Sequence, residues 1–81
     1  MEKSLKSAEY ARFIALLVAT RHEAGIRQHA LAKKLRKPQS FVAKYEGGER
    51  RLDVIEFIVI AKALGADPIK LLRRLLRTKA S

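Results

Sequence analysis

The sequence predicts an all-α fold of five short helices, and three observations support this. Nothing in the chain is typical of two strands joined by a turn. Glycine and proline interrupt the chain at intervals that fit short helices. The length of 81 residues suits one small domain. We expect a single domain over residues 1–81, with its core at about 8–77.

The first three expected helices follow from their apolar spacing and from the breaks between them. The first, at 7–23, carries apolar side chains along one broad side and is followed by Gly25. The second, at 28–35, ends in lysines shortly before Pro38. The third, at 39–46, is followed directly by two glycines.

The last two expected helices carry the clearest end signals. The fourth, at 54–64, begins after Asp53, and Glu56 completes a D-x-x-E form of the capping box. Gly65 then follows as a left-handed stop. The fifth, at 68–77, opens on an Asp-Pro pair, with an N-cap and a proline in the first turn.

Composition narrows the classes of function. Lysine and arginine number 18 against 8 acids, and the net charge of +10 favours a polyanionic partner or an anionic surface. The absence of cysteine excludes disulfides and thiolate metal sites. The two histidines lie on different expected helices, and the acids do not pair at a spacing suited to acid and base catalysis. We therefore expect no catalytic residue, metal, cofactor or small-molecule ligand.

Export and membrane insertion are not expected. The apolar run at 13–19 is not followed by a small-residue cleavage site. No apolar run approaches the ~20 residues that cross a bilayer. We expect a cytoplasmic protein.

The stretch RKPQSFVAKYEGGERR, residues 36–51, predicts a helix with two different sides and a basic segment after it. At 100° per residue, Gln39, Ser40 and Lys44 fall on a small polar side, opposite the apolar residues. Such a side suits the major groove, because the small residues let the backbone approach while Gln39 and Lys44 reach base edges. The alternative is an ordinary amphipathic helix with a solvated outer side.

Cations flank this polar side. Lys37 precedes it, and Arg50 and Arg51 follow it, a layout that suits the two phosphate backbones bordering one groove. Gln28 begins the second expected helix, where its side chain and backbone N–H could bind a phosphate near the positive end of the helix dipole. The alternative for Gln28 is a plain exposed residue of the first turn.

An ion pair between the first and third expected helices is also predicted. Arg21 projects near the middle of the first helix's apolar arc, where a guanidinium must be paired or must extend to solvent. Glu46 lies at the margin of the third helix's apolar side and is its natural partner. The alternative is that both groups are independently solvated.

From Leu17 through Leu72 the chain resembles the helix-turn-helix domain of the lambda repressor, Cro and XRE-like regulators. The matching pieces are Arg21, Gly25-Ile26, Gln28, Leu31-Ala32, Leu35, residues 39–46, residues 48–51, residues 61–65 and Asp67-Pro68. The resemblance implies a five-helix domain with the helix-turn-helix at its second and third helices. It also implies a transcriptional regulator that binds double-stranded operator DNA as a dimer, with the third helix in the major groove.

By position, the resemblance implies specific residue roles. It implies base contacts for Gln39, Ser40 and Lys44 and phosphate contacts for Gln28, Arg50 and Arg51. It further implies an interhelical ion pair between Arg21 and Glu46.

Two residues depart from the family pattern, and both add positive charge beside the expected DNA face. Arg36 replaces the usual turn glycine; a left-handed arginine is strained by about 1 kcal/mol, so the turn is either strained or reshaped by Pro38. Arg27 replaces the usual Thr or Asn cap and cannot accept the free N–H groups of the second helix.

The fifth expected helix predicts a homodimer, because its apolar arc of about 160° exceeds the ~100° stripe that one core requires. One stripe holds Ile69, Leu72 and Leu76, and another holds Leu71 and Leu75. We expect Leu72, Leu75 and Leu76 to form a symmetric dimer interface that makes the operator a pseudo-palindrome. The alternative is that the first helix covers the second stripe within one protomer.

Two other functions stay open. The leucines and arginines of the fifth helix separate onto two faces, as in helices that bind membrane surfaces. The chain could also be an antitoxin or another protein-interaction module of the same fold.

Overall fold

The computed structural model describes residues 8–79, which form five α-helices and no strand. The all-α class and the order of the helices are confirmed, with bounds that differ from the expected ones by at most two residues. The helices are α1 (Ala8–Glu23), α2 (Gln28–Leu35), α3 (Gln39–Glu46), α4 (Val54–Ala63) and α5 (Pro68–Lys79).

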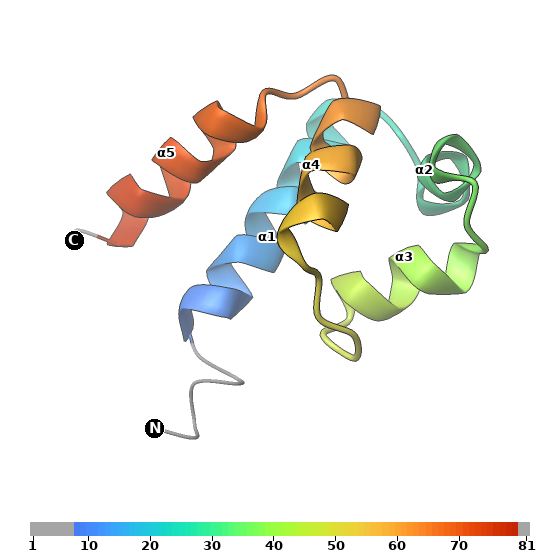
Figure 1. Ribbon diagram of the computed structural model, residues 1–81, viewed down its shortest axis with the longest axis horizontal. Helices are drawn as coiled ribbons and strands as arrows, with labels where there is room; N and C mark the ends of the chain where they lie inside the picture. The colour runs from blue at the N-terminus through green and yellow to red at the C-terminus, as the bar shows by residue number, and fades with distance from the viewer. Residues whose placement is uncertain (1–7, 80–81) are drawn as a thin grey trace.

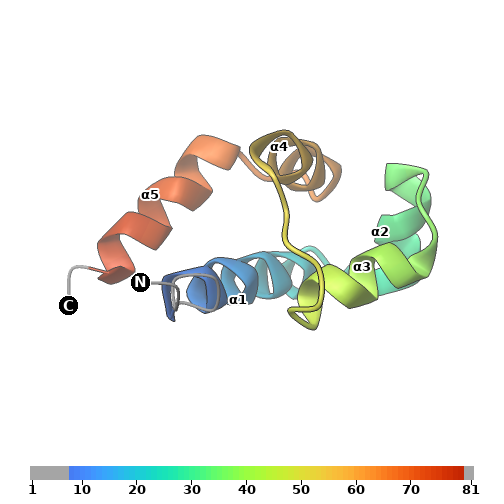
Figure 2. The same cartoon turned by 60° about the horizontal axis from the view of Figure 1, so that its bottom comes forward.

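The helices are arranged around a central pair. Figures 1 and 2 show α1 and α4 in the middle of the molecule, α5 at one end and the α2–α3 pair at the other. Helix α2 packs against α3 and α4, and α5 packs against α1 and α4. Helix α3 packs against α1 and α2, so it lies at an edge of the molecule with its outer side uncovered.

Every helix contributes to one apolar core. Phe13 and Phe57 join α1 to α4, with ring centroids 5.4 Å apart in an edge-to-face arrangement. Such a ring pair adds about 0.5–1.5 kcal/mol beyond the burial of its area. The buried core side chains are Ile14, Leu17, Leu31, Ala32, Val42, Tyr45, Phe57, Ile60, Ala61, Leu64 and Leu71.

The predicted ends of α4 and the start of α5 are confirmed. The Asp53 carboxylate accepts a hydrogen bond from the Glu56 N–H at 2.7 Å, and the Glu56 carboxylate accepts one from the Asp53 N–H at 3.0 Å. Gly65, with φ of 75°, follows α4 as the left-handed residue. The Asp67 carboxylate accepts from the Ile69 N–H at 2.9 Å and caps α5.

Of the two alternatives for the turn between α2 and α3, the structure shows the left-handed geometry at Arg36 and not a turn reshaped by Pro38. Arg36 has φ of 59° and ψ of 43° and is the one residue other than glycine with positive φ among residues 8–79. This conformation lets the Arg36 N–H donate to the Lys33 carbonyl at 3.1 Å and the Lys37 N–H to the Ala32 carbonyl at 3.0 Å. Two satisfied carbonyls at the end of α2 offset the backbone strain.

Candidate nucleic-acid interface

Helix α3 turns one side to the core and the other to solvent. Val42 and Tyr45 are fully buried. Gln39, Ser40 and Lys44 are all exposed on the opposite side. Burial alone would fit any amphipathic surface helix, so the surroundings of α3 decide whether the side is suited to DNA.

A part-buried ion pair attaches α3 to α1. The Arg21 Nε donates to a Glu46 carboxylate oxygen at 2.7 Å and its Nη2 donates to the other oxygen at 3.0 Å. The Arg21 Nη1 also donates to the Ile26 carbonyl at 2.8 Å, and the two charged side chains are only 9% and 7% exposed. Hydrogen bonding to Glu46 raises the pKa of Arg21, against the opposing effect of burial. The C-terminal end of α3 is therefore held at a defined place on α1.

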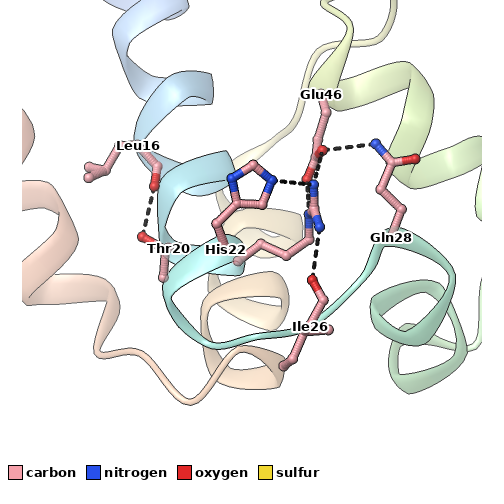
Figure 3. Close-up of polar contacts among 7 residues, drawn as sticks. Leu16, Thr20, His22, Ile26, Gln28 and Glu46 are labelled. Carbon is pink, nitrogen blue, oxygen red and sulfur yellow. Dashed lines mark hydrogen bonds and ion pairs between the residues drawn. The ribbon is translucent and has the colours of Figure 1, made fainter.

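The same carboxylate also binds α2. The Gln28 Nε2 donates to Glu46 at 2.9 Å, and Figure 3 shows Glu46 between the side chain of Gln28 and the end of α1. Gln28 is half-buried, and its amide oxygen points away from this cluster. Arg27, immediately before it, makes no side-chain cap bond, as expected for an arginine at that position. Side chains from α1 and α2 therefore both bind Glu46 of α3. The sequence did not predict the contact of Gln28 with Glu46.

Arg50 is held on α3 and α4 together. Its Nη1 and Nη2 donate to the two carboxylate oxygens of Glu56 at 3.0 Å and 2.8 Å. Its guanidinium carbon lies 4.8 Å from the centre of the Phe41 ring. The bonds from Arg50, followed by that from the Asp53 N–H, lower the pKa of Glu56. Arg50 is therefore an ordered cation whose charge is partly offset, although its side chain remains 42% exposed.

Arg51 contacts a different aromatic ring from that of Arg50. Its guanidinium carbon lies 4.0 Å from the centre of the Tyr10 ring on α1. The Tyr10 hydroxyl in turn accepts a hydrogen bond from the Leu52 N–H at 3.1 Å. The neighbouring Arg50 and Arg51 therefore contact different rings, Phe41 and Tyr10. No short-range sequence signal indicates either contact.

Lys37 completes the cations around α3. It is exposed, immediately precedes the N-cap of α3, and places its Nζ 5.4 Å from the centre of the Phe41 ring. The exposed polar side of α3 therefore has a cation before its start and others in the segment after its end.

Two kinds of feature are absent from the described residues. Residues 8–79 contain no group of three potential metal ligands among His, Cys, Asp and Glu. Within the same range, no helix has both the length and the apolar character needed to cross a bilayer.

Helix α5 leaves an apolar stripe in solvent. Leu71 is 4% exposed and faces the core, whereas Ile69, Leu72 and Leu76 are 57%, 41% and 69% exposed. Leu75 is half-buried and lines, with Leu72, a groove of about 510 Å³ between α5, α1 and α4. Helix α1 therefore does not cover the stripe of Ile69, Leu72 and Leu76 within the chain.

Comparisons with known proteins agree with this geometry. Residues 18–71 match a family model described as helix-turn-helix. A solved structure described as an XRE-family like protein, from Pseudomonas syringae pv. tomato str. DC3000, is 45% identical and superposes with a TM-score of 0.88. The alignment covers 95% of this chain and 94% of that one. No curated protein matches.

Proposed function

The chain belongs to the XRE family of helix-turn-helix DNA-binding domains, and from this membership we propose that it is a cytoplasmic transcriptional regulator. Domains of this family are not enzymes. In this proposal it binds a pseudo-palindromic operator as a homodimer, with α3 in the major groove. The observation that carries the proposal is the exposed polar side of α3, held in place by the buried Arg21–Glu46 pair and flanked by cations.

Base recognition is assigned to Gln39, Ser40 and Lys44. All three are exposed on the side of α3 that faces away from the core. A glutamine can pair with adenine N6 and N7, and a lysine can donate to guanine O6 and N7. The small side chain of Ser40 lets the helix backbone approach the groove.

Phosphate contacts are assigned to Gln28, Lys37, Arg50 and Arg51. Lys37 precedes α3 and Arg50 follows it, and both side chains lie against the Phe41 ring, where they are placed to contact phosphates. Gln28 stands in the first turn of α2, where the helix dipole favours an anion. Its side-chain NH₂ group already donates to Glu46, so its contact is assigned chiefly to the backbone N–H.

The dimer is assigned to α5. Leu72 and Leu76 form an uncovered stripe with Ile69, and Leu75 extends it toward the groove. A two-fold axis through this stripe would cover it with its own copy. The two copies of α3 would then lie about 34 Å apart, one turn of B-DNA.

Salt dependence tests the DNA contacts. If a dimer makes about 8 phosphate contacts, the slope of log K against log salt concentration is about −7. We expect this slope by fluorescence anisotropy on a site selected from random DNA. A slope shallower than about −2 would contradict the proposal.

Substitutions separate base reading from phosphate binding. Gln39→Ala or Lys44→Ala should cost roughly 1–3 kcal/mol on the selected site and relax preference at one or two base pairs. Arg51→Ala should weaken binding to all sequences about equally. A change in base preference with Arg51→Ala and none with Gln39→Ala would reverse the assignment.

The oligomeric state tests the α5 interface. Leu76→Glu introduces a charge into the exposed stripe without altering the core and should give a monomer by light scattering. Ile55→Glu is the matched control, because Ile55 on α4 is 67% exposed, close to the 69% of Leu76. A folded Leu76 variant that is still dimeric would remove α5 from the interface.

A further inference from the structure

The ring of Phe41 is a meeting point for two cations from opposite ends of α3. The Lys37 Nζ lies 5.4 Å from the ring centre, and the Arg50 guanidinium carbon lies 4.8 Å from it. Both distances fall within the ~6 Å over which a cation is attracted to an aromatic face. Lys37 and Arg50 are 13 positions apart in the chain, so the ring brings together charges that the sequence separates.

The ring is itself held by the core. Phe41 is half-buried and contacts the Tyr45 ring edge to face, with centroids 5.7 Å apart and planes at 64°. Tyr45 is fully buried one turn further along α3. The ring therefore has a defined orientation relative to the helix that carries the reading residues.

The two cations are also restrained from their other sides. Lys37 lies between the left-handed Arg36 and Pro38, which limits its backbone to extended conformations. Arg50 is bound by both carboxylate oxygens of Glu56. The Arg50 side chain is thus restrained by Glu56 of α4 as well as by Phe41, and Lys37 has a restrained backbone as well as its contact with Phe41.

We propose that Phe41 is a positioning residue for DNA binding, whose ring holds Lys37 and Arg50 against the same aromatic side chain, ready to contact phosphates beside α3. The proposal rests on the DNA-binding function proposed above. A lysine or arginine loses rotamer freedom when it binds a phosphate, and a side chain that is already held loses less. The apolar ring offers nothing to a phosphate, so its effect on binding acts through the two cations.

The test is a set of variants in the full chain, measured on duplex DNA of random sequence, where phosphate contacts dominate binding. Phe41→Leu keeps an apolar side chain and removes the ring, and we expect about threefold to tenfold weaker binding. Phe41→Tyr keeps the ring and should bind like the wild type. If urea unfolding shows that Phe41→Leu is not folded without denaturant, Phe41→Met takes its place.

A double-mutant cycle separates positioning from simple packing. Lys37→Gln and Arg50→Gln should each weaken binding clearly less in the Phe41→Leu background than in the wild type, because the ring no longer orders them. Equal losses in both backgrounds, or wild-type binding by Phe41→Leu, would overturn the positioning role alone. A wild-type chain that does not bind duplex DNA would overturn the proposed function as well.

Discussion

Replacing Arg36 by glycine should stabilise the domain and weaken its binding to DNA. Arg36 holds φ of 59° and ψ of 43° at the end of α2. A residue with a Cβ atom is disfavoured there by roughly 1–2 kcal/mol, whereas glycine adopts this region freely. The greater conformational freedom of glycine in the unfolded chain lowers this gain in stability by roughly 0.5–1 kcal/mol.

The net gain in the free energy of unfolding is therefore about 0.5–1 kcal/mol. With a denaturant slope of about 1 kcal/mol/M, the urea midpoint of Arg36→Gly should rise by roughly 0.5–1 M. Arg36→Ala is the matched control, since it removes the same charge and keeps the Cβ atom. It should show no gain, because alanine is also disfavoured at positive φ.

The charge of Arg36 predicts the opposite change in DNA binding. Arg36 is exposed and stands beside Lys37, next to the start of α3. If the Arg36 charge contacts one phosphate per half-site, its removal should weaken binding to all sequences and make the salt slope shallower by about 1 per half-site, equally for the glycine and alanine variants. The assays are urea unfolding by circular dichroism and anisotropy across a range of salt. Equal stability of the two variants would refute the strain argument, and wild-type binding by both would refute the role of the charge.

Three further predictions concern buried or paired polar groups. Arg21→Met or Glu46→Leu alone should lower the free energy of unfolding by about 3 kcal/mol, because each leaves a desolvated charge unpaired. The double variant should lose clearly less than the sum of the two single losses. Additive losses in urea unfolding would mean that the two side chains do not interact. Tyr45→Phe should raise the free energy of unfolding by up to about 1 kcal/mol, because the hydroxyl is buried without a hydrogen-bond partner among residues 8–79; a clear loss would show that this hydroxyl is bonded. Hydrogen bonds from Arg50 are the main reason that Glu56 has a lowered pKa in the folded state. Its stabilising contribution is therefore complete above the unfolded pKa of about 4.3 and is lost as the pH falls through the folded pKa. Glu56→Gln should therefore lose less thermal stability than the wild type between about pH 6 and about pH 3, and an equal loss would show that Glu56 does not contribute.

The sequence by itself determined the features that depend on neighbouring residues. The five helices follow from apolar spacing and from the glycines and prolines between them, and the Asp53–Glu56 capping box follows from two residues three positions apart. The polar side of α3 also follows, because 100° per residue places Gln39 and Lys44 opposite the core side chains. Helical periodicity and end capping are short-range effects, so a sequence displays them directly.

Apart from the Arg21–Glu46 pair, which helix projection predicted, the tertiary structure decided the contacts between distant side chains. The contact of Gln28 with Glu46, the division of two adjacent arginines between Phe41 and Tyr10, and the stripe of α5 that stays in solvent all depend on how the helices pack. The left-handed Arg36 belongs here too, because both a strained turn and a reshaped one fit the same residues. Such contacts join positions far apart in the chain, and a change in helix packing of a few ångströms would exchange one partner for another, since hydrogen bonds and cation–ring contacts act only at short range.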